Sequence, residues 1–378
     1  MPIQTYSVSY STGASYIALT NVQNISISLG RNSQLDQYNA SSASISLRYP
    51  TGFASPITDL VTGTFIRITN TTSGKDQFFG VINNVTARYG IPYAGGVGVS
   101  DFLDISVEGS FAKYGRYQGN GYAMPSGTLQ YQIGLAGGEV YTPATFVPSG
   151  QSPTMAATTV TGTWGDWLNR SLLTINGRMI DALENAVEVQ WGYGTGSSTA
   201  NFSDVANNAT NQVYDEINFL SLADNFFTQI TVTPESASAS TVSKSGASLP
   251  YRTLQTNTFN FSTGQATDFA NYLLSTFGTS KFAVGSISCL AAAQNSFQLD
   301  KIGRAENGGY SLPYAIGTQI TIAFRGTTIN AYVEGVDVTA SPSGSRYTYY
   351  LSGDDFNNVL ILGSDPLRSR LDYNRLGY

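Results

Sequence analysis

The feature of this sequence that most limits its fold is a series of short segments in which apolar and polar residues alternate. Ala43–Tyr49 reads Ala-Ser-Ile-Ser-Leu-Arg-Tyr before Pro50, and Val22–Leu29 has the same tendency before Gly30. Because successive side chains of a β-strand point to opposite faces, such segments predict strands that are buried on one face. Further strands are expected at Phe65–Ile68, Phe78–Ile82 and Phe102–Val107. Short strands at this spacing are typical of a β-sandwich or β-barrel.

Two later segments have helical spacing. Apolar residues recur every three to four positions in Thr163–Leu173 and in Thr263–Thr276. Gly177 and Gly278 follow them, where a helix-ending glycine is common. The apolar positions are Trp164, Trp167, Leu168 and Leu172 in the first segment, and Ala266, Phe269, Ala270, Leu273 and Phe277 in the second. We expect the two tryptophans to anchor a core rather than to stack on a ligand.

One pattern of residues occurs twice, once near each end of the chain. Gly63-Thr-x-Ile-x-Ile68 is followed by Gly80-Val and by Val85-Thr-Ala87. Gly317-Thr-x-Ile-x-Ile322 is followed by Gly335-Val and by Val338-Thr-Ala340. Each copy then runs into an alternating segment that ends at a glycine, which is Gly109 in the first copy and Gly353 in the second. This echo predicts two related β-barrels.

These features predict a mainly β fold with a few helices, in which smaller α+β regions are inserted around two related β-barrel domains. Segments rich in Gly, Ser and Ala, at 192–211 and Thr231–Ser248, are expected to be loops. The expected divisions are an N-terminal barrel at 1–112, an insert at 113–211, a second barrel at 212–240 and 311–355, a second insert at 241–310 with a helix at 263–277, and a tail at 356–378.

The composition excludes several functions. Charged residues make up 12% of the chain, about half of the roughly 25% typical of soluble domains. A surface so poor in charge suits a protein that is packed against others. The net charge is −6 and Lys and Arg form no cluster, which argues against sequence-specific binding of nucleic acid. The N-terminus does not resemble a signal peptide, and no run of about 18 apolar residues exists, so no membrane span is expected.

The chain contains no histidine, which excludes Ser-His-Asp and Cys-His catalysis and most zinc and non-haem iron sites. Its one cysteine, Cys289, lies in an alternating segment and is interpreted as a buried strand residue rather than a nucleophile. The glycine-rich loop that starts at Gly192 lacks the lysine of a phosphate-binding loop. We therefore expect no catalytic, cofactor-binding or metal-binding residues, and no enzyme.

Two alternatives remain open at this point. Asp354 with Asp355, or Asp166 with Asp181 and Glu184, could be the paired carboxylates of a glycoside hydrolase. Because turns recruit Asp and the chain has 25 acidic residues, neighbouring carboxylates are expected without any such role. The 24 tyrosines could bind sugars, although aromatic residues in such numbers more often fill β-cores and subunit contacts.

Several short motifs resemble one family. In order along the chain they are Arg31-Asn-Ser-Gln-Leu-Asp36, Gly63-Thr-Phe-Ile-Arg-Ile68, Phe78-Phe-Gly-Val-Ile82 and Leu103–Tyr114. They resemble the opening barrel of the minor tail proteins, or baseplate hub proteins, of long-tailed phages. Later parts of such proteins are similar to Tyr251–Leu254 with the helix after it, to Arg346–Ser352 and to the ending Leu371–Tyr378.

The resemblance implies a structural subunit of the tail tip. Hub proteins place two related barrels in each subunit, and three subunits form a ring that joins a hexameric tube to a threefold tip. It implies a homotrimer in the virion, assembled in the host cytoplasm, with a channel for the tape-measure protein and DNA. The implied partners are the tail tube or distal tail protein, the tape-measure protein and a central fibre or spike. The alternative is a host-receptor or carbohydrate-binding tail protein.

Overall fold

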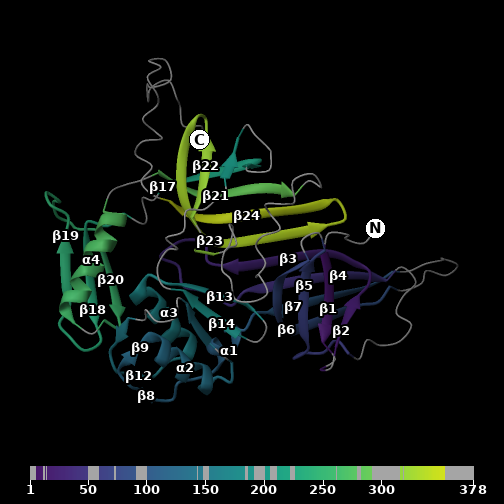
Figure 1. Ribbon diagram of the computed structural model, residues 1–378, viewed down its shortest axis with the longest axis horizontal. Helices are drawn as coiled ribbons and strands as arrows, with labels where there is room; N and C mark the ends of the chain where they lie inside the picture. Colours follow the sequence, from purple (N-terminus) through teal and green to yellow (C-terminus); the bar gives the residue numbers. More distant parts are fainter. Residues whose placement is uncertain are drawn as a thin grey trace.

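The chain is mainly β, as the sequence predicted. Figure 1 shows the computed structural model, in which strands fill most of the molecule and the helices gather on one side. The structure describes residues 6–11, 13, 15–49, 59–71, 74–90, 100–142, 144–147, 153–183, 186–190, 201–204, 211–221, 226–260, 262–278, 282–291, 316–317 and 319–353.

The helices of this part of the chain are α1 (Phe111–Arg116), α2 (Leu129–Glu139), α3 (Trp164–Ile175) and α4 (Thr263–Phe277). The strands up to α3 are β1 (Tyr6–Ser11), β2 (Tyr16–Leu19), β3 (Val22–Gly30), β4 (Ser42–Tyr49), β5 (Phe65–Asn70), β6 (Lys75–Arg88), β7 (Asp101–Glu108), β8 (Tyr122–Met124), β9 (Gly127–Thr128), β10 (Ala144–Val147), β11 (Thr154–Met155) and β12 (Thr158–Val160). The later strands are β13 (Arg178–Leu183), β14 (Ala186–Gln190), β15 (Asn201–Ser203), β16 (Asn211–Val213), β17 (Glu216–Ser221), β18 (Gln229–Pro234), β19 (Ser240–Ser243), β20 (Thr253–Thr258), β21 (Phe282–Ala291), β22 (Gln319–Phe324), β23 (Thr327–Ser341) and β24 (Gly344–Gly353).

One large sheet joins the two ends of the chain. It has 14 strands, and its main path runs β16-β15-β22-β23-β3-β4-β7-β6-β5-β1-β2, with β24, β21 and β17 branching from β23. Among the described residues the sheet is not closed, so the two closed barrels expected from the sequence are corrected to two halves of one open sheet. The physical reason is the partner of β3, which pairs with β23 of the other half instead of returning to β2.

The two halves of this sheet share one strand order. The first half consists of β1 to β7. The second half consists of β15, β16, β17, β21, β22, β23 and β24, which we number first to seventh in this order. In both halves the order across the sheet is third, fourth, seventh, sixth, fifth, first, second. One difference is that β15 runs parallel to both neighbours, whereas β1 runs antiparallel to both of its own.

The equivalence extends to single residues. Gly63 and Gly317 both have positive φ, 97° and 85°, and both donate their backbone N–H to the sixth strand of their half. The accepting carbonyls belong to Ile82 and Val333, and each strand is bulged directly after that residue. Ile82 in β6 therefore corresponds to Val333 in β23.

This alignment modifies the echo seen in the sequence. The outer matches hold, because Gly63 corresponds to Gly317 and the last glycines, Gly109 and Gly353, lie at equivalent distances from the bulges. The inner match does not hold. Gly80 lies opposite Ile66, and the residue opposite Ile320 is Ala331 rather than Gly335.

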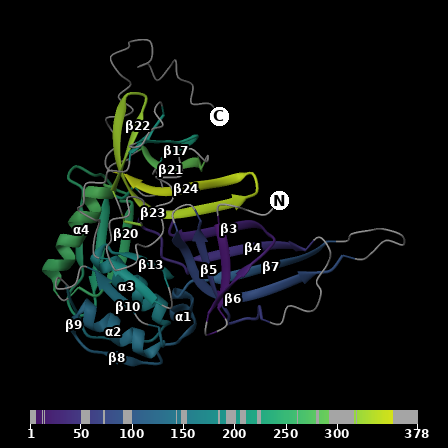
Figure 2. The ribbon, with the colours of Figure 1, turned by 45° about the vertical axis from the view of Figure 1, so that its right-hand side comes forward.

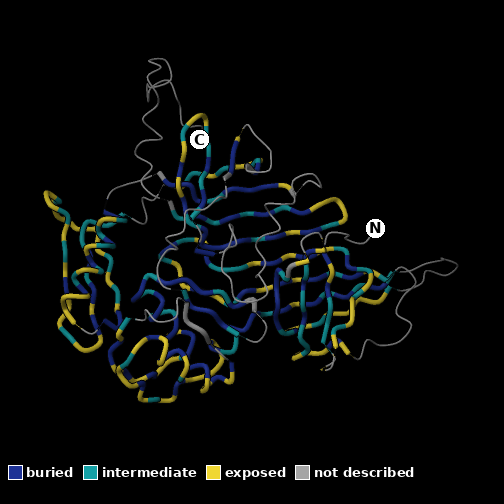
Figure 3. Tube along the Cα trace, viewed as in Figure 1, coloured by how far each residue is buried: buried dark blue, intermediate teal, exposed yellow. Residues whose placement is uncertain are grey.

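The apolar faces of both halves form one hydrophobic core. In β3 and β4 the alternating residues Ile25, Ile27, Ile45 and Leu47 are at most 2% exposed, as strand periodicity requires. The second half contributes its own alternating residues, among them Val336, Val338, Tyr347 and Tyr349. Figure 3 shows buried residues recurring along the strands of both halves, where they alternate with intermediate and exposed ones.

A second core lies between the halves in sequence. It is formed by residues of α1, α2 and α3 and of the strands β8, β11, β12, β13 and β14, at the lower left of Figure 2. The side chain of Thr163 accepts the backbone N–H of Asp166, and the Asp166 side chain accepts that of Thr163, which makes a capping box at the start of α3. Trp164 and Trp167 are 2% and 4% exposed in this core, so both are core anchors.

A third core lies under α4. This helix, in the segment where the sequence predicted one, covers the sheet β19-β18-β20 with Ala266, Ala270 and Leu273 against Ile230 and Val232. The loop predicted at Thr231–Ser248 is wrong, because most of β18 and all of β19 lie there. The strand signal was hidden because Ser and Thr fill the exposed face. The sheet pairing also divides the chain differently from the expected boundary near 240, since β18 pairs with β20 and β21 belongs to the large sheet.

Candidate functional site

The two halves of the sheet meet where β3 runs antiparallel to β23, and we call this contact the junction. Ile25 to Gly30 lie opposite Ala340 to Gly335, in continuous register. The backbones approach closely at the end of the junction. A Cβ atom on Gly30 would lie 2.3 Å from the carbonyl oxygen of Glu334, and one on Gly335 would lie 2.5 Å from that of Arg31. Only glycine fits at both positions.

A buried ion cluster lies at this end of the junction. Arg31 Nε lies 2.8 Å from Glu334 Oε2, and Arg178 Nη2 lies 3.1 Å from Glu334 Oε1. The hydroxyl of Ser352 donates a hydrogen bond to the same carboxylate. The side chains of Glu334 and Arg178 are fully buried, and that of Arg31 is 6% exposed. The Arg31 guanidinium also lies over the ring of Tyr38, at 4.7 Å.

The cluster keeps Glu334 ionised. Burial alone would raise the pKa of Glu334, but the charges of Arg178 and Arg31 and the hydrogen bond from Ser352 outweigh burial, so the pKa lies below its ordinary value. Arg31 follows β3, Arg178 begins β13 and Glu334 lies at the bulge of β23. One carboxylate thus connects both halves of the sheet and the helical region between them.

Sequence reasoning missed this cluster. The available signal was a single acidic residue, Glu334, in the apolar run Ala331–Val336 of a strand that was expected to be buried. Its partners could not be found from the pattern of residues, since Arg31 and Arg178 are far from it along the chain.

The carboxylates proposed for glycoside hydrolysis have structural partners or lie outside the described residues. Asp166 belongs to the capping box of α3. Asp181 is buried, and its carboxylate accepts the backbone N–H of Ser41 at 2.9 Å and that of Phe111 at 3.3 Å. Burial raises the pKa of Asp181, although these hydrogen bonds act in the opposite direction. Glu184, Asp354 and Asp355 lie outside the described residues, as do residues 192–200. The loop predicted at 192–211 is wrong in its described part, because β15 lies there and β16 begins at its last residue.

Cys289 is buried in β21 opposite Tyr347, as interpreted from the sequence. Burial raises the pKa of its thiol, which opposes formation of a reactive thiolate. The described residues include no group of three or more acidic, cysteine or histidine side chains that could hold a metal ion. None of the helices described is long and apolar enough to cross a membrane.

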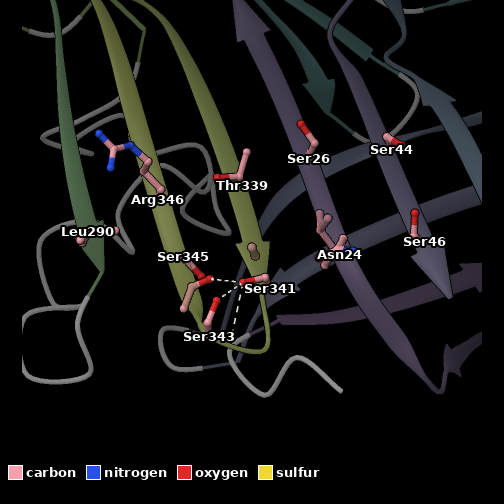
Figure 4. A pocket seen from close by; sticks show the side chains of 13 residues that line it. Asn24, Ser26, Ser44, Ser46, Leu290, Thr339, Ser341, Ser343, Ser345 and Arg346 are labelled. Atoms are coloured by element: carbon pink, nitrogen blue, oxygen red, sulfur yellow. Dashed lines mark hydrogen bonds between the residues drawn. The ribbon is translucent and has the colours of Figure 1, made fainter. Parts of the chain in front are cut away.

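A polar groove of about 420 Å³ crosses the junction on the solvent side of the sheet. Figure 4 shows Asn24, Ser26 and Ser44 on one side of it and Thr339 and Arg346 on the other. Its other lining residues are Ile25, Ser46, Leu290, Ala340, Ser341, Ser343, Gly344 and Ser345. None of these residues is aromatic, so the groove offers no flat ring on which a sugar could stack.

No protein-family model matches the sequence, and no curated protein matches it. Solved structures do match the fold. A tail protein from Neisseria meningitidis superposes with a TM-score of 0.64 at 13% identity, covering 93% of this chain and 97% of that one. A 43 kDa tail protein of a Shewanella oneidensis prophage gives 0.62 at 10% identity, covering 92% and 97%.

A third structure has a TM-score of 0.53 at 8% identity and covers 92% of this chain and 77% of its own. It is an E. coli component of the type VI secretion system that is structurally similar to tail proteins gp27 and gp5 of phage T4. Identities this low establish the fold rather than a shared activity. The resemblance read from the sequence motifs is confirmed at this level: the chain has the fold of phage tail proteins.

Proposed function

We propose that this chain is a structural hub subunit at the tip of a phage tail, where three copies form a ring. The observation that carries the proposal is the shared strand order of the two halves of the sheet. Three copies would present six similar seven-stranded units. Such a ring could contact a hexameric tail tube through six similar surfaces and a threefold tip through three identical ones.

The proposed partners follow from this position. They are the tail tube or distal tail protein on one side, a central fibre or spike on the other, and the tape-measure protein and DNA in the channel. The net charge of −6 would keep DNA from adhering to the subunit as it passes. In this proposal the subunit is part of the virion, is assembled in the host cytoplasm and performs no catalysis.

Electron-microscopy class averages of the purified protein at high concentration test this function. Threefold rings with six similar lobes are the expected result. Monomers at every concentration, together with specific binding to host cells or glycans, would instead favour the receptor- or carbohydrate-binding alternative. Activity on cell-wall polysaccharide that is lost in Asp166→Asn would favour a hydrolase, although Asp166 already caps α3.

A further inference from the structure

At the junction, the third strand of one half pairs with the sixth strand of the other half. Two such pairs are possible, and only one of them forms within the chain. The third strand of the first half, β3, lies on the sixth strand of the second half, β23. The converse pair would consist of the third strand of the second half, β17, and the sixth strand of the first half, β6. These two strands are not paired with each other within the chain.

The edge of β6 that corresponds to the junction is open. Lys75 to Val81 pair with β5, and Ile82 exchanges hydrogen bonds with Gly63 and Thr64. From Asn84 to Arg88 the one hydrogen-bonded neighbour in the described part of the sheet is β7. In β23 the equivalent segment, Gly335–Ala340, has β24 on one edge and β3 on the other.

The outer edge of β17 is open in the same way. β3 has β4 on one edge and β23 on the other. Its counterpart β17 pairs with β21, and the described part of the sheet places no strand on its other edge. The register of β17 on β21 places Ile217 at the position of Ile25, because both lie opposite an isoleucine of the fourth strand, Ile287 or Ile45.

β6 and β17 have apolar residues at the positions that are buried at the junction, but in β6 and β17 these residues are more exposed. In β23, Val336 and Val338 are at most 1% exposed, whereas the corresponding Val85 is half-buried and Ala87 is exposed. In β3, Ile25 and Ile27 are at most 2% exposed, whereas the corresponding Ile217 and Phe219 are half-buried. The same positions are therefore covered inside the chain and uncovered at its two open edges.

Exposed large side chains also mark the two edges. Leu220 of β17 is 51% exposed, and Tyr89, directly after β6, is 64% exposed. An open strand edge with apolar side chains beside it readily accepts another strand, and proteins commonly protect such edges. A second copy of this chain is the occupant that the equivalence of the two halves predicts, because it presents the complementary edge.

We propose that β17 of one copy adds antiparallel to the Asn84–Arg88 edge of β6 in the next copy, which repeats the internal junction between chains. Transferring the internal register places Phe219 opposite Ala87, Leu220 opposite Thr86 and Asn218 opposite Arg88. A ring of three copies then has six similar junctions, three within chains and three between them. The ring of three copies rests on the proposed function, and the pairing of β17 with β6 in this register goes beyond it.

Disulfide cross-linking of the full-length protein tests this register. Leu220→Cys combined with Thr86→Cys places two thiols on directly opposite residues of different copies, within disulfide reach. Under mild oxidation we expect loss of the monomer band and appearance of covalent dimers and trimers on a non-reducing gel. Each single variant should remain monomeric on the gel, because a head-to-tail contact brings together unlike positions.

Leu220→Cys with Asn84→Cys is the matched control, since Asn84 lies on the same edge two residues out of register. Weak cross-linking is expected for this pair. Equal or stronger cross-linking than for the Thr86 pair would overturn the register. Threefold rings in electron microscopy without cross-linking of either pair would overturn the edge contact and keep the hub function. Monomers in microscopy and no cross-linking would count against both.

Discussion

At the scale of single residues, Glu334 is the buried carboxylate of β23 that pairs with Arg31, next to β3, and with Arg178 of β13. Glu334→Gln keeps the size of the side chain but leaves the buried guanidinium groups of Arg31 and Arg178 without this anion. Loss of one member of a buried ion cluster typically costs about 3–5 kcal/mol. We expect the free energy of unfolding, measured by urea denaturation, to fall by that order.

Glu108→Gln is the matched control for this substitution. Glu108 forms an ion pair with Arg116, whose side chain is 59% exposed. Exposed pairs contribute at most about 1 kcal/mol. Similar losses of stability in the two variants would show that burial of the Glu334 cluster does not set its energetic weight.

The same carboxylate gives a pH dependence of defined sign. Because the folded-state pKa of Glu334 is lowered, its contribution is fully present above the unfolded pKa of about 4.3 and is lost as the pH falls through the folded value. The stability difference between the wild type and Glu334→Gln should therefore shrink on acidification below about pH 4. Urea midpoints of both proteins across this range measure it. A difference that stays constant down to about pH 2 would contradict the assignment.

At the scale of elements, the sequence predicted best where local pattern and tertiary environment agree. The alternation in Ala43–Tyr49 lies within β4, and the tryptophan spacing lies in α3. The sequence did not predict the helix α2, because this segment includes Gly134, Gly137 and Gly138 and therefore has low helix propensity. That helix is supported instead by the Thr128 cap and by buried side chains of the second core.

The open sheet could not be predicted from the sequence for a related reason. Alternation in Val22–Leu29 predicts a strand with one buried face, but it carries no information about which strand pairs with each edge. The pairing of β3 with β23 depends on a close approach of Gly30 to Gly335, which is visible only in three dimensions.

Gly30→Ala tests that close approach. Gly30 has φ +80°, and an added Cβ would meet the backbone of Glu334 at 2.3 Å. We expect a loss of stability beyond the roughly 1–3 kcal/mol of left-handed backbone strain alone. Gly63→Ala is the control, because φ is +97° there and no atom lies within 4 Å of the added Cβ. Thermal denaturation compares them, and equal shifts would contradict a steric role for the junction.

The capping box of α3 gives a second prediction at this scale. Thr163→Ala removes the side-chain oxygen that accepts the backbone N–H of Asp166 at 3.0 Å. We expect a loss of about 1 kcal/mol, as for other helix N-caps. Thr163→Ser retains the hydroxyl and should lose less than half of that amount. Urea denaturation of both variants decides whether the hydroxyl or the methyl group of Thr163 matters.

At the scale of the whole molecule, the low charge content and the duplicated strand order indicate which interactions would hold copies of the chain together. A chain with 12% charged residues has few ion pairs to offer a neighbour. At the proposed contact, Arg88 and Glu216 already pair with Asp104 and Arg346 of their own chain. Backbone hydrogen bonds and the apolar side chains beside them would then carry the association.

The proposed ring should therefore resist salt. Raising the ionic strength from about 0.1 M to about 1 M shortens the Debye length from about 10 Å to about 3 Å and weakens contacts made by exposed charges. Contacts made by apolar burial and strand pairing are not weakened in this way. We expect the trimer fraction, measured by sedimentation velocity at fixed protein concentration, to stay constant or to rise slightly. Dissociation on adding salt would show that charged surfaces hold the copies together, and would contradict strand addition between β17 and β6 as the main contact.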